Sequence, residues 1–406
     1  MAKFGLLGKT LKHSFSPQIH KLLGGYEYDL IEKEQVELES FVKSGEYTGL
    51  NVTIPYKKEI IKYLDVVDDC AKKIGAVNTV IKQNGTLYGY NTDWYGMEYA
   101  LKSAGIDLFG KKVLILGSGG TSNTATFVAH HLGAKQVLIV SRNGEINYQN
   151  CYLQTDAQVI INTTPVGMYP NNYEVPLDLS KFENLEGVFD AVYNPNMTYL
   201  TFLANKKGVK YSNGLTMLVA QAKMASELFT NTKIDDTLID NAVKNIKTQT
   251  GNIVLIGMAG VGKSTIAKEL SKRLQKPVID TDQLIEQREG KKISQIFAQY
   301  GEEYFRKVES QVLMDVGKQN GNIIATGGGV VERDENKFYI KQNAIVVNLV
   351  RDLEKLDRKN RPLSTDLDAV KKLFIRRKDK YLDFSDFTID NNYDLQITIE
   401  KIMEKL

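Results

Sequence analysis

The sequence predicts an α/β protein with more than one sheet in a single chain of 406 residues. Two stretches, 113–132 and 253–274, each consist of an apolar strand pattern, a glycine-rich turn and a helical pattern. Short apolar segments alternate with helical patterns along most of the chain, which is typical of sheets covered by helices. At roughly 150 residues per domain, this length indicates two to three domains.

The composition is that of a globular protein without a strong charge bias. Its 52 basic and 49 acidic residues give a formal net charge of +3, so nothing favours nucleic acid or an anionic membrane as a partner. We find no run of eighteen apolar residues and no signal-like N-terminal segment. Cys70 and Cys151 lie in no metal or redox spacing, so we expect two reduced thiols in a cytoplasmic protein. The oligomeric state is left open.

The first half of the chain divides into two α/β regions. In the first region, strands are expected at 3–8, 26–31, 49–52 and 76–81, with a helix at 34–43. In the second, a strand at 113–116 leads through the glycine turn into a helix reaching Leu132, and a strand follows at 137–141. Only about fifteen residues then separate Arg142 from the next strand, 158–162, too few for a full helix and strand with connections. This part of the sheet is therefore expected to be abridged.

Three helical patterns and a short polar linker precede the second half. The helices are expected at 199–207, 215–229 and 234–246, and the linker at 247–251. After the linker, strands are expected at 253–256, 277–279, 322–325 and 344–349, with helices between them through 318 and at 352–358 and 367–380. This order predicts a parallel sheet with helices on both faces.

The first glycine turn has the shape of a Rossmann-type dinucleotide site. Backbone N–H groups at a helix N-terminus bind a pyrophosphate in such turns, and the residues here are Gly117, Ser118, Gly119, Gly120 and Thr121. An acidic residue after the next strand would hold a ribose 2′-hydroxyl, but Ser141 and Arg142 stand there instead. A cation beside a hydroxyl favours NADP(H) over NAD. The alternative is that Arg142 is only a solvated surface charge.

The second glycine turn is a P-loop in its required place between a strand and a helix. Backbone N–H groups of such a loop surround phosphates, its lysine reaches the terminal phosphates, and its first hydroxyl ligates Mg²⁺; these residues are Gly260, Gly262, Lys263, Ser264 and Thr265. Asp280 and Asp282 follow the second strand of this half, where one carboxylate can serve Mg²⁺ and the other an acceptor hydroxyl. The alternative is that they only cap the next helix.

Polar residues also gather at strand ends and helix starts of the first half, at 14–17, 51–57, 75–79 and 89–93. Taken singly they could be helix caps, as with Ser16 before Pro17 or Asp93 before its helix. Combined with the segments 161–168, 190–195 and 213–222, they make residues 1–240 resemble shikimate dehydrogenase. The resemblance implies reversible, NADP-dependent reduction of 3-dehydroshikimate to shikimate.

The same resemblance implies roles for individual residues. Lys57 and Asp93 would be the catalytic pair, and the substrate would be held by Ser14, Ser16, Thr53, Asn78, Tyr193 and Gln221. These roles agree with elementary chemistry, because an ammonium beside a carboxylate can stabilise and protonate the oxygen of a carbonyl that receives hydride. Neutral hydroxyl and amide side chains suit a triol. One basic residue of the family's phosphate-binding stretch is missing here, so dual use of NAD stays open.

The second half carries further segments with chemical character, at 305–309, 325–329, 360–363 and 377–381. With the P-loop and residues 280–282 they make the stretch 252–400 resemble shikimate kinase, which implies ATP-dependent phosphorylation of shikimate at its 3-hydroxyl. By that resemblance Lys263 and Arg361 serve the phosphates, and shikimate is bound by Asp282, Arg306, Gly328, Gly329 and Arg377. Asp282 would orient the attacking hydroxyl or act as its base.

Two arginines suit one small carboxylate, because guanidinium groups bind carboxylates bidentately. The alternative for Arg306 is a surface ion pair with Glu303 on the same helix. The glycines at 327–329 let backbone N–H groups approach a substrate where a Cβ would intrude. Arg358 and Arg361 lie three residues apart, so the segment that would close over ATP is short, and adenine stacking by Arg358 is in doubt.

The sequence therefore predicts a bifunctional enzyme in which the product of the first site is the substrate of the second. A substrate-binding domain is expected at 1–97 with 213–247, an NADP-binding domain at 98–212 and a kinase domain at 252–406. Two alternatives remain: a working kinase with a degenerate, non-catalytic dehydrogenase-like module, and a nucleotide-sensing scaffold. Retention of Lys57, Asp93, Lys263 and Asp282 argues against both. Only small molecules are expected as partners.

Overall fold

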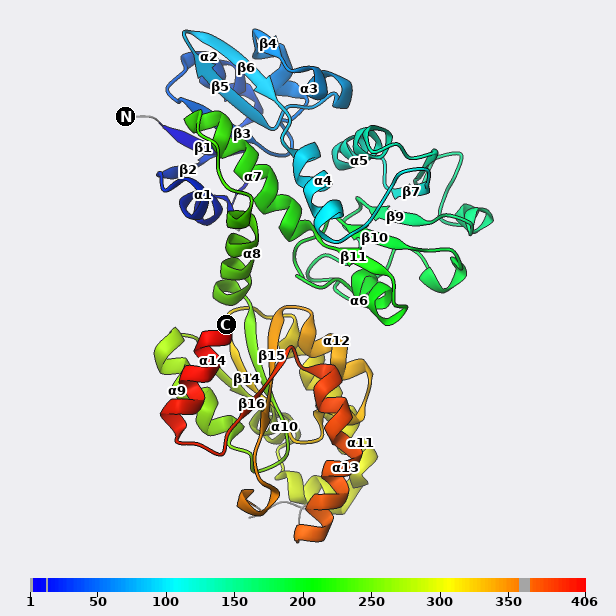
Figure 1. The fold of residues 1–406 in the computed structure, drawn as a ribbon, viewed down its shortest axis with the longest axis vertical. Helices are drawn as coiled ribbons and strands as arrows, with labels where there is room; N and C mark the ends of the chain where they lie inside the picture. Colours follow the sequence, from blue (N-terminus) through cyan, green and yellow to red (C-terminus); the bar gives the residue numbers. More distant parts are fainter. Residues whose placement is uncertain (1–2, 12–13, 358–365) are drawn as a thin grey trace. The chain divides into compact units, whose positions relative to one another are not determined.

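A computed structural model describes residues 3–11, 14–357 and 366–406 (Figure 1). The chain divides into two compact units, Met1–Lys244 and Asn245–Leu406. The division falls within helix α8 (Thr237–Thr250), so most of the predicted linker, 247–251, is the end of a helix. The residues of this last turn are polar and show no helical spacing of apolar residues, so the sequence did not predict it as helix. In the structure, the Thr250 hydroxyl donates to the Ile246 carbonyl at 2.8 Å.

The predicted α/β fold class is confirmed, with one mixed and two parallel sheets. The first sheet has the order β2-β1-β3-β5-β6-β4, and β5 runs antiparallel to both β3 and β6. Its strands are β1 (Phe4–Gly8), β2 (Tyr28–Glu32), β3 (Gly49–Val52), β4 (Val66–Val67), β5 (Thr79–Gln83) and β6 (Thr86–Tyr90). The strand expected at 76–81 is present as β5, with its ends shifted, and it forms an unexpected hairpin with β6 through a turn that contains Asn84 and Gly85, both at positive φ. That dipeptide strongly favours such a turn, so a usable signal was present.

The second sheet is parallel, with the order β11-β10-β9-β7-β8. Its strands are β7 (Lys112–Leu116), β8 (Gln136–Val140), β9 (Val159–Asn162), β10 (Gly187–Asp190) and β11 (Lys210–Ser212). Alternate residues of β7 enter two separate cores, Val113 and Ile115 on the face of α5 (Gly120–His131), Leu114 and Leu116 on the face of α6 (Tyr199–Lys206). Between β8 and β9 lies one short 3-10 turn, η3 (Cys151–Gln154), in agreement with the expected abridgement.

Helices of the first unit connect and cover these two sheets. They are α1 (Ser16–Gly24), α2 (Leu38–Ser44), α3 (Asp69–Ile74), α4 (Asp93–Ser103) and α7 (Gly214–Thr230). The helix expected at 34–43 is split into the 3-10 turn η1 (Gln35–Glu37) and α2. Figure 1 shows α4 lying beside α7, and these two helices pack closely against each other.

Gly96 sets the distance between α4 and α7. A Cβ at this position would lie 2.5 Å from the Met217 carbonyl oxygen and 2.9 Å from the Gln221 Cβ, both on α7. We expect Gly96→Ala to lower the free energy of unfolding of this unit by about 1–3 kcal/mol, because overpacking forces the helices apart. Thermal unfolding measured by circular dichroism checks the prediction, with Lys102→Ala on the exposed side of α4 as control. Equal melting temperatures for Gly96→Ala and the unmodified chain would contradict it.

The second unit contains a parallel sheet in the order β13-β14-β12-β15-β16. Its strands are β12 (Asn252–Ile256), β13 (Val278–Asp280), β14 (Ile323–Ala325), β15 (Ala344–Val350) and β16 (Phe387–Asp390). Figure 1 shows α9 (Lys263–Leu274) and α14 (Leu395–Lys405) on one side of it, and α12 (Glu335–Lys341) and α13 (Leu367–Phe384) on the other. Helices on both faces agree with the prediction.

The helices expected through residue 318 are present, whereas the helix expected at 352–358 is not found over its described residues. Over its described residues, 352–357, this segment contains only the 3-10 turn η6 (Leu353–Lys355), because its charged residues bury a single apolar side chain, Leu356. Helix α11 (Ile293–Gly317) follows α10 (Thr281–Glu289) and is interrupted at Gly301, which has φ 80° and ψ 174°. Of the described helices, none is both long and apolar enough to cross a membrane, and Cys70 and Cys151 are free.

Candidate functional site

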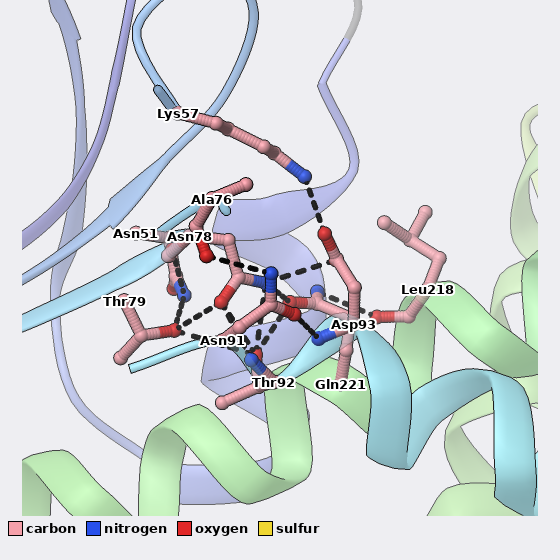
Figure 2. Close-up of polar contacts among 10 residues, drawn as sticks. All are labelled: Asn51, Lys57, Ala76, Asn78, Thr79, Asn91, Thr92, Asp93, Leu218 and Gln221. Carbon is pink, nitrogen blue, oxygen red and sulfur yellow. Dashed lines mark hydrogen bonds and ion pairs between the residues drawn. The ribbon is translucent and has the colours of Figure 1, made fainter. Parts of the chain in front are cut away.

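The predicted pair Lys57 and Asp93 is brought together in the first unit. Lys57 lies in the turn after β3, Asp93 is the first residue of α4, and Figure 2 shows the two side chains pointing toward each other. The Lys57 Nζ and the Asp93 Oδ2 are 2.6 Å apart, with the side chains 29% and 15% exposed. A partly buried ion pair of this kind places a proton donor beside a carboxylate. The alternative that Asp93 is a helix cap is wrong, because Thr92 holds the N-cap position and no side chain caps the helix.

Asn78 orients the other oxygen of Asp93. Its Oδ1 accepts hydrogen bonds from the Thr92 backbone N–H at 2.7 Å and from the Thr79 hydroxyl at 3.0 Å. Because a backbone N–H can only donate, this contact settles which end of the amide is oxygen. The Asn78 Nδ2 therefore faces Asp93 and donates to its Oδ1 at 2.9 Å. Asp93 is thus held by an ammonium on one oxygen and an amide on the other (Figure 2).

Gln221 approaches the same group from α7. Its Oε1 lies 3.4 Å from the Asn78 Nδ2 and accepts from the Thr92 hydroxyl at 3.2 Å, while its Nε2 donates to the Leu218 carbonyl at 2.8 Å. The contact of α4 with α7 at Gly96 positions this side chain. Residues separated by more than a hundred positions in the sequence therefore form one polar cluster around Asp93.

The remaining predicted substrate ligands lie near helix α1 and the end of β10. The Ser14 hydroxyl accepts from the Ser16 backbone N–H at 3.2 Å, and Phe15 contacts Tyr193 edge to face with ring centroids 5.9 Å apart. Ser16 is the first residue of α1 and not its N-cap, which is Phe15, so the capping alternative is wrong for Ser16 as well. Burial raises the pKa of Tyr193. Thr53 directly follows β3, four residues before Lys57.

Buried polar residues behind Asn78 complete this cluster and lie outside the predicted set. Asn51 is 5% exposed, and its Nδ2 donates to the Thr79 hydroxyl at 3.0 Å and to the Asn78 carbonyl at 3.3 Å. Its Oδ1 accepts from the Tyr28 hydroxyl at 2.7 Å. An asparagine inside an apolar strand could have indicated this layer, because a buried amide needs hydrogen-bond partners.

Thr79→Val tests whether this second layer orients Asn78. The change keeps the shape of the side chain but removes the hydroxyl that donates to Asn78 and accepts from Asn51. We expect kcat for the predicted reduction of 3-dehydroshikimate to fall about tenfold, because losing a buried hydrogen bond costs about 1–3 kcal/mol. Steady-state kinetics check this, with Thr79→Ser, which retains the hydroxyl, expected to restore most of kcat. A Ser variant as impaired as the Val variant would contradict the prediction.

A cavity of about 870 Å³ lies at the predicted dinucleotide turn. Its wall includes Gly117, Ser118, Gly119, Ser141 and Arg142, while Gly120 and Thr121 form the first turn of α5 beside it. The cavity is large enough for part of a dinucleotide, and its N–H groups and guanidinium suit phosphates, so these residues fit NADP(H). Arg142 is exposed and borders the cavity, so both of its interpretations stay open. Tyr148, from the abridged segment, also lines the cavity and was not predicted.

The P-loop of the second unit runs from Gly257 between β12 and α9. Gly257, Gly260 and Gly262 all have positive φ, which curls their backbone around a central space. Lys263 is buried, and its Nζ donates to the carbonyls of Gly257 at 2.7 Å and Met258 at 3.0 Å. The lysine charge is therefore held inside the loop that is predicted to bind phosphates.

Ser264 and Asp280, the predicted metal ligands, are in contact. The Ser264 hydroxyl donates to the Asp280 Oδ2 at 2.8 Å, and the Asp280 Oδ1 caps α10 by accepting from the N–H groups of Asp282 and Gln283. Asp280 is thus a helix cap as well as a neighbour of the P-loop. Two oxygen donors of this kind suit Mg²⁺, which takes few protein ligands and completes its shell with water and phosphate. Among the described residues no cluster of three or more His, Cys, Asp or Glu side chains could hold a metal by itself.

Arg306 is a buried member of an ion-pair network on α11. Its Nη1 donates to Glu309 at 2.7 Å, and its Nε and Nη2 donate to Glu302 at 3.2 and 3.1 Å. The alternative of a surface ion pair between Arg306 and Glu303 is wrong, because Glu303 contacts Arg333 instead. Burial raises the pKa of Glu309, against the opposing effect of Arg306. A Cβ at Gly329 would meet the Arg306 guanidinium at 2.1 Å, which shows how closely the glycine loop approaches it.

Asp282 and Arg377 border the same glycine loop. A Cβ built on Gly327 would lie 2.7 Å from the Asp282 Oδ1 and 2.8 Å from the Glu309 Oε1. On the other side, the Gly328 carbonyl accepts from the Arg377 Nη1 at 3.1 Å and from the Tyr381 hydroxyl at 2.5 Å. The loop 327–329 is therefore surrounded by the predicted acceptor residues Asp282, Arg306 and Arg377. Arg361 and Arg358 lie outside the described residues.

Known protein families match both halves of the chain, in agreement with the two resemblances seen in the sequence. The shikimate dehydrogenase substrate binding domain matches residues 6–80, and the shikimate kinase family matches residues 259–406. A shikimate dehydrogenase (NADP(+)) of Caldicellulosiruptor bescii is 37% identical over 254 residues, which are 55% of this chain and 87% of that protein.

Solved structures resemble the same part of the chain. The crystal structure of shikimate dehydrogenase 1 from Peptoclostridium difficile is 36% identical with a TM-score of 0.56, covering 61% of this chain and 98% of that one. A Thermus thermophilus shikimate 5-dehydrogenase in complex with NADP(H) and shikimate is 30% identical with a TM-score of 0.55, covering 60% of this chain and 99% of that one. The chain belongs to the shikimate dehydrogenase family over this N-terminal part and carries a shikimate kinase domain at its C-terminus.

Proposed function

We propose that the chain is a bifunctional enzyme that reduces 3-dehydroshikimate to shikimate with NADPH and then phosphorylates shikimate with ATP. The observation that carries the proposal is the presence of two polar centres in one chain, each beside a glycine-rich loop between a strand and a helix. One combines the Lys57–Asp93 pair with the cavity at Gly117, and the other combines the P-loop with Asp282 and two buried arginines.

In the proposed reduction, residues 117–121 with Ser141 and Arg142 would hold NADPH, whose nicotinamide would supply the hydride. Lys57 donates a proton or a charged hydrogen bond to the carbonyl oxygen as negative charge develops there. Asp93, held by Asn78, keeps the ammonium in place and accepts a hydrogen bond from a neighbouring substrate hydroxyl. Ser14, Ser16, Thr53, Asn78, Tyr193 and Gln221 are proposed to bind the remaining hydroxyls and the carboxylate.

NADP(H) is the proposed cofactor because Ser141 and Arg142 border the cavity where an acidic residue would favour NAD. The Thermus relative contains NADP(H) in its structure. A single phosphate-binding cation gives a smaller preference than a pair, so NADH is expected to support slower reduction. Titration of the protein with NADP⁺ and NAD⁺ by calorimetry measures this preference without catalysis.

In the proposed phosphorylation, the chain supplies position and charge. Backbone N–H groups of Gly260 and Gly262 and the ammonium of Lys263 hold the terminal phosphates, with Ser264, Thr265 and Arg361 assisting. Arg306 and Arg377 bind the shikimate carboxylate, Gly328 and Gly329 let the ring approach, and Asp282 orients the attacking hydroxyl. Ser264 and Asp280 would hold Mg²⁺, which would neutralise phosphate charge.

Removal of Mg²⁺ separates the two activities. Ser264 and Asp280 belong to the second centre, and the mechanism proposed for the first centre uses no metal ion. With excess EDTA we expect phosphorylation to fall at least about a hundredfold, whereas NADPH oxidation stays unchanged. Both rates are measured on the same sample. Loss of NADPH oxidation in EDTA would contradict this assignment of the metal.

The proposed domains follow the three sheets. Residues 1–97 with 213–247 form the substrate-binding domain, 98–212 the NADP-binding domain and 252–406 the kinase domain. Expression of 1–250 and 251–406 as separate proteins tests the last boundary, because each fragment should retain one activity.

The full chain tests the whole proposal in one reaction. Purified protein is mixed with 3-dehydroshikimate, NADPH, ATP and Mg²⁺, and both NADPH loss and shikimate 3-phosphate are followed. We expect both signals. Phosphorylation of added shikimate without any NADPH or NADH oxidation would favour the alternative of a kinase with a non-catalytic module. Absence of both reactions would favour a nucleotide-sensing scaffold.

A further inference from the structure

Glu332 lies immediately after the glycine loop and contacts Arg377, one of the two proposed carboxylate ligands. It belongs to the 3-10 turn η5 (Val330–Glu332) and its side chain is 15% exposed. Its Oε1 accepts from the Arg377 Nε at 2.5 Å and also from the neighbouring Arg376. Although burial opposes it, the two arginines lower the pKa of Glu332, so the group is a carboxylate at neutral pH.

The donors of Arg377 are divided between two elements. Its Nε is taken by Glu332 and its Nη1 by the Gly328 carbonyl. Its Nη2 is buried and makes no hydrogen bond with any described residue. A buried guanidinium N–H without a partner is costly, so this donor is the natural point of contact for an anionic ligand.

Arg306 has no guanidinium nitrogen that lacks a hydrogen-bond partner among the described residues. Its Nε, Nη1 and Nη2 all donate to Glu302 and Glu309 on its own helix. A ligand carboxylate that approached Arg306 would have to share its nitrogens with Glu302 and Glu309, whereas the Nη2 of Arg377 would gain its first partner. Arg377 is accordingly the stronger of the two carboxylate contacts.

We propose that Glu332 is a positioning residue that holds Arg377 by its Nε and thereby directs the free Nη2 toward the carboxylate of the substrate. This inference rests on the proposed kinase function. Without Glu332, the guanidinium could turn toward Glu309, whose carboxyl group it already influences electrostatically. If only net charge mattered, E332Q would bind shikimate more tightly than the unmodified protein, because removing an anion favours an anionic ligand.

The test compares two ligands that differ only at the carboxylate. Binding of shikimate and of its neutral methyl ester to the full chain is measured by calorimetry, without ATP. In the unmodified protein we expect shikimate to bind at least about tenfold more tightly than the ester, as a charge-assisted hydrogen bond is worth about 1.5–3 kcal/mol. In E332Q we expect this ratio to fall to within about threefold, while the affinity for ATP and the melting temperature change little.

Two further variants make the result decisive. Arg376→Ala removes the exposed partner of Glu332 and should keep the full ratio. Glu332→Asp retains the charge on a shorter side chain and should recover part of the affinity ratio between shikimate and its ester. This variant replaces E332Q in the test if E332Q does not fold. Binding in the first centre is weakened by carrying Lys57→Ala and Gln221→Ala in every full-length protein, and the signal is assigned to the second centre by its loss when Arg377→Ala is added.

The outcomes separate the two claims. If the unmodified kinase neither binds nor phosphorylates shikimate, the proposed function is wrong and the inference falls with it. If it does both, but E332Q keeps a tenfold ratio or binds shikimate more tightly, the inference about Glu332 is wrong and the function stands. An equal loss of affinity for both ligands in E332Q would indicate a purely structural role for Glu332 and would also overturn the inference.

Discussion

Lys57→Ala is expected to reduce the rate of 3-dehydroshikimate reduction by about a thousandfold. Its Nζ is the cationic group 2.6 Å from Asp93, and proton transfer by a positioned side chain contributes about 10²–10⁴ to a rate. Phosphorylation of added shikimate by the same variant should be unchanged, because the P-loop and its neighbours belong to the other unit. Loss of NADPH absorbance and formation of shikimate 3-phosphate, followed in parallel, measure the two rates.

The adjacent lysine provides the matched control. Lys58 is exposed, and Lys58→Ala should leave both activities within about twofold of the unmodified protein. Calorimetry with NADP⁺ should give the same affinity for Lys57→Ala, which separates lost chemistry from lost cofactor binding. Lys57→Ala with normal reduction would exclude the proposed role, and equal damage by Lys58→Ala would indicate a general effect of charge.

Lys263→Ala is expected to abolish phosphorylation, with a loss of at least about a thousandfold, while reduction stays intact. The ammonium neutralises phosphate charge in a buried position where electrostatic interactions are strong. In the structure it also bonds to two carbonyls of its own loop, so the variant loses part of the loop's internal support. Rates of shikimate 3-phosphate formation and ATP affinity by calorimetry check the prediction together.

Lys268 lies exposed on the same helix and supplies the control. Lys268→Ala should retain phosphorylation and ATP binding. Circular dichroism of Lys263→Ala shows whether the second unit still unfolds cooperatively, so that a folding defect is told apart from a lost phosphate contact. A Lys263→Ala protein that is folded and still phosphorylates shikimate at the normal rate would rule out the proposed role of the P-loop lysine.

Local sequence patterns predicted most of the sheets and helices. Strand β3 has its expected ends, and both glycine turns lie between a strand and a helix as predicted. Such motifs are readable because the residues that determine them are contiguous. Short strands such as β4, with two residues, and the helical end of the expected linker left too few apolar positions to be recognised.

The hydrogen-bond and ion-pair partners of individual side chains were harder to predict from the sequence. Asp93 and Ser16 were compatible with helix caps, and only the observed N-cap residues Thr92 and Phe15 exclude this. Arg306 could pair with several acidic residues on one helix turn, and burial on the inner face selected Glu302 and Glu309 over Glu303. Spacing along a helix indicates which pairs are possible, but the orientation of the helix in the core selects among them.

The sequence by itself determined the α/β class, the two phosphate-binding turns and the two sets of polar residues that carry the family resemblance. These features depend on backbone conformation and on residue types within short segments. Only the tertiary structure decided that the Asn78 amide faces Asp93, that each nitrogen of the Arg306 guanidinium already donates a hydrogen bond and that the Nη2 of Arg377 is not bonded to a described residue. Such hydrogen bonds join residues far apart in the chain, and their geometry exists only once the core has brought those segments together.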